Sequence, residues 1–291
     1  MTLSRRDVLA AASTLIGITD AVAASGKAVG PAEPAARATA ANGPSSSGYR
    51  AVDNNAFVTL AGQKWQAQTG APGGVSVNDA DMVRFAARTG ERASFDPPRK
   101  IRAELCGQQR YAKGEPIRFS GAVTVDRASR ITGTDWCSFL QIHQADPVRS
   151  NGQFAMASPL FAVDLSLDRS GKPVLRARGE TGKGEQRTFS PMRIFGSAPF
   201  AFGVEHSFSL EATDGHGDAG RIRFLLNGRP VCDFSGPTGY EYVDLLKDAL
   251  PGRQQLTGSY LKMGIYAGKF SGNAPPPDVF VAYTFRRLKT G

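Results

Sequence analysis

Short runs in which apolar and polar residues alternate, punctuated by glycine, proline and aspartate, dominate the chain after residue 48. Successive side chains of a strand point to opposite faces, so a period of two predicts half-buried strands. Only residues 242–250 have a helical pattern, and that stretch is short. The runs expected to be strands include Met82–Ala87, Ile117–Val125, Leu160–Leu167, Pro173–Ala177, His206–Ala212, Arg221–Leu226, Val231–Phe234, Tyr260–Ala267 and Val279–Leu288.

Turn signals between these runs indicate how the strands connect. Asn227-Gly228 separates two apolar runs, which is a strong signal for a tight hairpin. Asp214–Gly220 is a second turn between two expected strands. Many short strands with such turns predict an all-β protein, either a sandwich or a jelly roll, in one domain from residue 49 to 291.

Three segments place polar side chains two residues apart on strands whose other face is apolar. They are Lys100–Leu105, Phe139–His143 and Tyr260–Tyr266. Alternation puts Arg102 with Glu104, Gln141 with His143, and Lys262 with Tyr266 on one face. The opposite face would carry Ile101, Ala103, Leu105, Leu140, Ile142, Leu261, Met263 and Ile265. A sheet with an apolar back and this front predicts a groove for an anionic ligand.

The first residues have the three parts of an export signal in order. Ser4–Leu9 matches the twin-arginine pattern, an apolar stretch too short to span a bilayer follows, and Ala21-Val22-Ala23 offers a cleavage site. We therefore expect a twin-arginine signal peptide over residues 1–24 and a periplasmic or secreted protein. Residues 25–48 are rich in Ala, Gly, Pro and Ser, which predicts a disordered linker.

Composition adds a preference for polyanionic partners. The 291 residues carry a formal net charge of +9, with 41% hydrophobic and 21% charged residues. Excess positive charge suits an acidic polysaccharide or nucleic acid, but the basic residues are scattered and no nucleic-acid motif occurs. We expect an acidic polysaccharide as partner, no nucleic acid, no membrane span, and a monomer.

The three cysteines would meet an oxidising compartment after export. By strict alternation Cys106 and Cys137 both lie on the polar faces of their strands, so a disulfide could join them if the strands are close. Three free, partly buried thiols are the alternative, and the sequence leaves the two open.

Several familiar site motifs are absent or incomplete in the sequence. No CxxC, HExxH or GxSxG occurs, which removes support for zinc sites, metalloproteases and serine hydrolases. Gly179–Gly184 lacks the spacing of a phosphate-binding loop. Asp214–Asp218 could contact calcium, but a hairpin turn explains it better. We therefore expect no cofactor and no metal site.

The polar face has the groups that β-elimination on a uronic acid polymer needs. That reaction removes the C5 proton beside a carboxylate and expels the oxygen at C4. Arginine and glutamine can neutralise the carboxylate. A neutral histidine can take the proton, and a tyrosine beside a cation can protonate the leaving oxygen.

The same three segments resemble the sequence blocks of jelly-roll polysaccharide lyases. Residues 102–105, 141–143 and 260–266 are similar to the R-x-E-L, Q-I-H and Y-x-K-x-G-x-Y blocks of alginate lyases, and the connecting stretches look closer to the heparin lyase I-like group. The resemblance implies a concanavalin-like β-jelly roll of two packed antiparallel sheets with a concave substrate groove. Cys106 stands where a second arginine is frequent, and Ala267-Gly268 replaces Asn-Gln, so the substrate need not be alginate.

The resemblance also implies roles for individual residues. Arg102 and Gln141 would hold the uronate carboxylate, His143 would be the base and Tyr266 the acid. The expected substrate-binding residues are Glu104, which would also orient Arg102 or Lys262, together with Lys262, which would contact substrate or tune Tyr266, and Trp136, which would stack on a sugar.

Each of these residues also has a structural interpretation. His143 could be a buried structural residue, Tyr266 a sheet aromatic, Arg102–Glu104 a plain ion pair, and Trp136 a core residue. At the level of function, the alternatives are a non-catalytic binder of acidic glycans on the same fold, which would not need His143 and Tyr266 together, and a jelly-roll glycoside hydrolase. A hydrolase needs two carboxylates across the scissile bond, and the Glu-x-Asp-x-Glu strand of laminarinase-type enzymes is absent.

Overall fold

The computed structural model describes residues 48–78, 82–144, 159–181, 193–239, 258–268 and 278–291. All of them belong to one unit, Ser46–Gly291. The expected signal peptide, nearly all of the expected linker and the short helical pattern at 242–250 lie outside the described residues.

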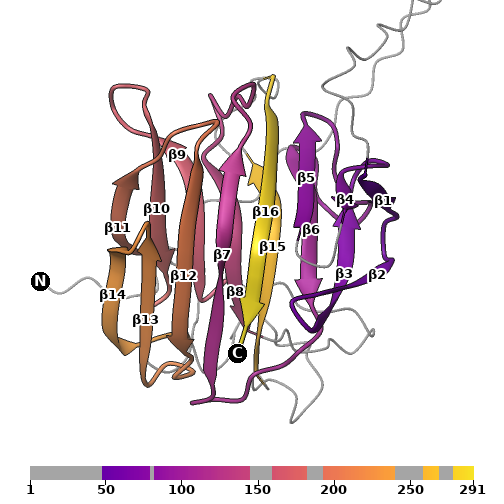
Figure 1. Cartoon of the computed structure of the whole chain (residues 1–291). Coiled ribbons are helices and arrows are strands. Elements are labelled where there is room, and N and C mark those ends of the chain that lie inside the picture. The colour runs from indigo at the N-terminus through magenta and orange to yellow at the C-terminus, as the bar shows by residue number, and fades with distance from the viewer. Residues whose placement is uncertain (1–47, 79–81, 145–158, 182–192, 240–257, 269–277) are drawn as a thin grey trace, which may run out of the picture. The chain divides into compact units, whose positions relative to one another are not determined.

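The described residues form sixteen strands in two eight-stranded sheets, and every strand pair is antiparallel (Figure 1). This confirms the all-β prediction, and all nine expected strands are present. The first sheet has the order β1 (Arg50–Val52), β4 (Val75–Val77), β5 (Met82–Arg88), β16 (Phe280–Thr290), β7 (Pro116–Val125), β12 (Glu205–Thr213), β13 (Ala219–Leu226), β14 (Arg229–Pro237). The second has the order β11 (Arg193–Pro199), β10 (Pro173–Gly179), β9 (Phe161–Leu167), β8 (Trp136–Gln144), β15 (Ser259–Gly268), β6 (Lys100–Gly107), β3 (Gln63–Thr69), β2 (Phe57–Leu60).

Aromatic side chains from both sheets form the core between them. The ring of Phe139 on β8 lies 6.3 Å from that of Phe208 on β12 and 5.9 Å from that of Phe285 on β16. The eight apolar residues predicted to back the polar segments are all buried in this core. Burial of this apolar surface is the main term holding the sheets together.

The turns have the backbone conformations that their residues favour. Asn227 and Gly228, with φ of 51° and 73°, connect β13 to β14 as predicted. Positive φ at both positions matches the right-handed twist of the strands, and Asn-Gly tolerates it best. Asp214–Asp218 is likewise a turn between β12 and β13: the Asp214 carboxylate accepts a 2.8 Å hydrogen bond from the His216 amide and a second one from Ser259 Oγ.

A β-bulge in β8 breaks the alternation on which part of the sequence analysis relied. The register shifts between Ser138 and Leu140, so Phe139 and Leu140 both face the core. Cys137 therefore points inward, with Sγ 3.0 Å from the Tyr283 hydroxyl, and its predicted place on the polar face is wrong. The same bulge turns Trp136 onto the polar face.

This geometry decides between the two states left open for the cysteines. Cys106 lies on the polar face of β6, whereas Cys137 faces the core, and β15 separates their strands. A disulfide requires Cα atoms within about 7 Å and facing Cβ atoms, so the two cannot be joined here. Cys106, Cys137 and Cys232 are buried thiols, and none of them is part of a disulfide.

No helix among the described residues has the length and apolar character needed to cross a lipid bilayer.

Candidate active site

The three predicted segments lie in β6, β15 and β8, which are neighbours in the second sheet, and β3 beside β6 adds Gln68, which was not predicted. Their registers place Gln68 opposite Glu104, Tyr266 opposite Arg102, and Lys262 opposite Gln141. Directly paired residues of antiparallel strands share a face. The predicted places of Arg102, Glu104, Gln141, Lys262 and Tyr266 on one face are therefore confirmed.

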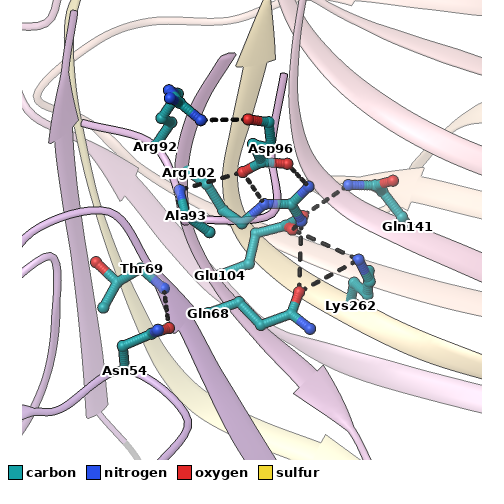
Figure 2. Close-up of polar contacts among 10 residues, drawn as sticks. All are labelled: Asn54, Gln68, Thr69, Arg92, Ala93, Asp96, Arg102, Glu104, Gln141 and Lys262. Carbon is teal, nitrogen blue, oxygen red and sulfur yellow. Dashed lines mark hydrogen bonds and ion pairs between the residues drawn. The ribbon is translucent and has the colours of Figure 1, made fainter. Parts of the chain in front are cut away.

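Glu104 is the centre of a hydrogen-bonded network on this face (Figure 2). Its Oε1 accepts a 2.7 Å hydrogen bond from Gln141 Nε2, and its Oε2 accepts one from Arg102 Nη1. Lys262 Nζ lies 3.7 Å from the same Oε2 and 3.5 Å from Gln68 Oε1. Since Glu104 is fully buried, these partners are what make its charge tolerable.

Asp96 holds the other side of the Arg102 guanidinium and was not foreseen from the sequence. Arg102 Nε and Nη2 donate to the two carboxylate oxygens of Asp96 at 2.7 and 2.6 Å, a bidentate pair that is nearly inaccessible to solvent. Burial opposes the charge on Arg102, but Glu104 and Asp96 outweigh it and raise its pKa above the usual range. Because Asp96 lies in the connection before β6, no strand pattern pointed to it.

The network is close to neutral overall. Arg102 and Lys262 supply two positive charges, Asp96 and Glu104 supply two negative charges, and Gln141 adds a neutral amide. Buried charges paired in this way are fixed in position, which is the preorganisation that electrostatic stabilisation of a developing charge requires. The network therefore fixes its donors on the polar face of the sheet and leaves none of these four buried charges unpaired.

Tyr266 lies beside Arg102, and its ring packs on cations and an indole. The Arg102 guanidinium carbon is 3.8 Å from the Tyr266 ring centroid, Lys100 Nζ is 5.5 Å away, and the Trp136 ring is 4.6 Å away. Burial raises the pKa of Tyr266 to about 12, and Arg102 opposes that rise. The phenol is therefore protonated at neutral pH and can donate a proton. The cations at its ring are Arg102 and Lys100, whereas Lys262 contacts Glu104 and Gln68.

Lys100 is partly desolvated at this end of the site. Burial lowers its pKa to about 8, Asp96 opposes this and Arg102 adds to it. Its Nζ lies 4.5 Å from the Trp136 ring, so Trp136 is part of an aromatic and cationic cluster on the polar face rather than a core residue.

His143 lies on the other side of Gln141 along β8. Its ring stacks on that of Tyr260 at 5.6 Å, and its Nδ1 is buried without a hydrogen-bond partner among the described residues. Burial, together with Lys262 and Arg102, holds the pKa of His143 well below 6.5. The imidazole is therefore neutral near pH 7 and can accept a proton.

The other two histidines have structural contacts, in line with the absence of catalytic neighbours in the sequence. His206 Nδ1 lies 2.9 Å from Asn227 Nδ2, and its Nε2 lies 3.1 Å from the Ala201 carbonyl oxygen. His216 Nε2 lies 3.2 Å from the Asp214 carboxylate in the turn after β12. Among the described residues, no group of three or more His, Cys, Asp or Glu side chains is arranged to hold a metal ion.

Taken together, the face has a neutral base, a protonated acid and a fixed set of amide and cationic donors between them. This combination suits abstraction of a proton next to a carboxylate followed by protonation of a leaving oxygen.

Comparison with known proteins gives the family. Among solved structures, an endo-β-1,4-glucuronan lyase from the fungus Trichoderma reesei matches with 13% identity and a TM-score of 0.50, over 84% of this chain and 94% of that one. A cysteine double variant of alginate lyase A1-II′ also matches with 13% identity and a TM-score of 0.50, over 78% and 93%. At this identity the likeness supports the fold, a jelly roll of two packed sheets. A search of curated proteins found no match. The model of the family described as "Polysaccharide lyase" matches residues 55–281, and the chain therefore belongs to the polysaccharide lyase family.

Proposed function

We propose that this polysaccharide lyase cleaves a uronic-acid-containing polysaccharide by β-elimination on the polar face of β3, β6, β15 and β8. The observation that carries the proposal is that a neutral buried His143 and a protonated Tyr266 lie on the same face of the sheet, with the Glu104 network between them. The similar structures that act on glucuronan and alginate support a uronate polymer as the substrate class.

In the proposed reaction, donors on the face neutralise the uronate carboxylate. Gln141 uses one Nε2 hydrogen on Glu104 and keeps the other for the substrate. Arg102 donates to Asp96 and Glu104, so it contributes mainly by its positive field and by fixing Glu104, and hence Gln141. Lys262, held by Glu104 and Gln68, adds a second cation. This arrangement lowers the cost of the enolate-like charge that develops when C5 loses its proton.

The proton transfers follow from the two protonation states. His143 takes the C5 proton, the C4–C5 double bond forms, and the C4–oxygen bond breaks while Tyr266 gives its proton to the departing oxygen. The product would have an unsaturated uronate at its new non-reducing end. Trp136, next to Tyr266, would pack on a sugar ring at this end of the site.

A hydrolase mechanism fits the same face poorly. A glycoside hydrolase needs one carboxyl group to donate a proton and a second to act as base or nucleophile. Here Asp96 and Glu104 are both bound to Arg102. The non-catalytic binder would use the same donors but would not depend on His143 or Tyr266 for any chemistry.

Two finer features are also part of the proposal. We propose export by the twin-arginine route, from the pattern in residues 4–9. We also propose a closer relation to the heparin lyase I-like group than to the alginate lyases, because the stretches that connect the three blocks look closer to that group. Cys106 and Ala267-Gly268 depart from the alginate lyase blocks and so disfavour alginate itself as the substrate.

An ultraviolet assay for unsaturated uronate ends tests the function. Mature protein would be incubated with glucuronan, alginate, heparin, heparan sulfate and hyaluronan, beside His143→Ala and Tyr266→Phe. Tyr283→Phe is the matched control because it removes a hydroxyl from the core side of the sandwich. We expect absorbance to rise with one polymer, to vanish in the two site variants and to persist in the control. Tight binding to a polymer without any rise would favour the binder and contradict the proposal.

A further inference from the structure

A phenylalanine stands exposed at the border of the site, where the function described above does not use it. Phe57, Phe95, Ile194 and Val204 are the exposed large hydrophobic side chains of the described part of the chain. Phe95, with 56% of its surface exposed, is the one beside Arg102: its ring centroid lies 5.2 Å from the guanidinium carbon. The Arg102 guanidinium also lies over the Tyr266 ring, so it contacts two aromatic rings.

The backbone that carries Phe95 is fixed by its neighbours. The Asp96 amide donates to the Ala93 carbonyl oxygen at 2.9 Å, the Ala93 amide donates back to Asp96 Oδ2 at 3.2 Å, and Arg92 binds the Asp96 carbonyl oxygen. The Asp96 side chain is clamped to Arg102, and two prolines follow it, each with restricted φ. An exposed ring on so rigid a turn is preorganised and would lose little conformational entropy on contact with a ligand.

The ring has one face left for a partner. Arg102 lies over one face of Phe95, and the large exposed fraction leaves the other accessible to solvent. A pyranose ring has one face of C–H groups that packs well on such a surface, because apolar area leaves water on both partners. The same connection carries Arg92 and Arg99, which line a pocket with Lys100, so the surroundings favour an acidic sugar.

We propose that Phe95 is a stacking platform for a pyranose unit of the acidic glycan, in a subsite next to the unit held at Gln141 and His143. The identity of the glycan rests on the proposed function, but the stacking contact itself does not require that the bond be cleaved.

The test measures binding separately from cleavage. Calorimetric titrations with glucuronan and alginate oligosaccharides would compare Phe95→Ala, Phe95→Tyr and Phe57→Ala, each in a His143→Ala background so that the ligand stays intact. Phe57 is the matched control: it is 50% exposed and also packs on a cation, Lys64, at 4.1 Å, but it lies on the edge strand β2.

We expect Phe95→Ala to weaken binding about tenfold, which corresponds to about 1.4 kcal/mol. Phe95→Tyr and Phe57→Ala should stay within about twofold of the parent, and unchanged melting temperatures would show that all variants fold. Unchanged binding by Phe95→Ala, an equal loss in Phe57→Ala, or no binding of the parent to either ligand would overturn the proposal. Loss of binding in Phe95→Ala by a protein without lyase activity would overturn the proposed function and leave the stacking contact standing.

Discussion

Replacing Asp96 with asparagine should destabilise the protein strongly, although Asp96 lies outside every strand. Its carboxylate accepts two hydrogen bonds from Arg102, at 2.7 and 2.6 Å, and one from the Ala93 amide, at 3.2 Å, and the Arg102–Asp96 pair is buried. Breaking a buried ion pair costs about 3–5 kcal/mol, because an uncompensated charge remains. Since Glu104 still contacts Arg102, we expect the lower end, about 3 kcal/mol.

Urea unfolding followed by fluorescence measures this loss. With a slope of about 3 kcal/mol per M, the midpoint should fall by about 1 M. Asp278→Asn is the control, because the Arg130–Asp278 pair is the same kind of contact with both side chains exposed, and such pairs contribute little. If Asp96→Asn lost less than about 1 kcal/mol, or no more than the control, Arg102 would not depend on Asp96 as the buried geometry requires.

Three further predictions concern pH, backbone and thiols. Burial and two nearby cations hold the pKa of His143 well below 6.5, so the acidic limb of the kcat/KM profile should lie below pH 6.5. Burial raises the pKa of Tyr266 to about 12, so Tyr266 should cause no loss of kcat/KM on the alkaline side below pH 10. A base that titrates at pH 6.5 or above would contradict this prediction. Gly264→Ala should lower the free energy of unfolding by at least ~2 kcal/mol more than Gly62→Ala does. Both glycines have positive φ, but only at Gly264 would an added Cβ clash with its surroundings. Equal losses of unfolding free energy in chemical denaturation would contradict this prediction. Because the three cysteines are buried and form no disulfide, they should react with a thiol reagent only after denaturation, and reductant should not shift the melting temperature. A mass corresponding to a disulfide would contradict this prediction.

Most of the fold could be predicted from alternation, because one-sided burial leaves a period of two in the sequence. The composition of the strands that the sequence analysis did not name, such as β3 and β11, explains why their patterns are weak. In β3 the buried positions include the small residues Ala67 and Thr69 beside Trp65, so the hydrophobic contrast is weak. In β11, Arg193–Pro199, every position is exposed or intermediate, so no buried position recurs with a period of two.

The candidate site was predictable only where it depended on parity within a regular strand. Arg102, Glu104 and Lys262 follow that rule, and their shared face is confirmed. Cys137 does not, because the bulge in β8 adds a residue that no propensity reveals. Asp96 was missed for a different reason: its contact with Arg102 depends on how the preceding connection folds back, which a strand pattern does not encode.

The elimination chemistry is tested most directly by letting the enzyme cleave its polymer substrate in water labelled with oxygen-18. An elimination breaks the C4–oxygen bond without consuming water, so mass spectrometry should show unsaturated products that contain no label beyond exchange at the reducing end. The His143→Ala and Tyr266→Phe variants should give neither product nor label. Saturated products with one labelled oxygen for each bond broken would mean hydrolysis, and would contradict the roles proposed for His143 and Tyr266.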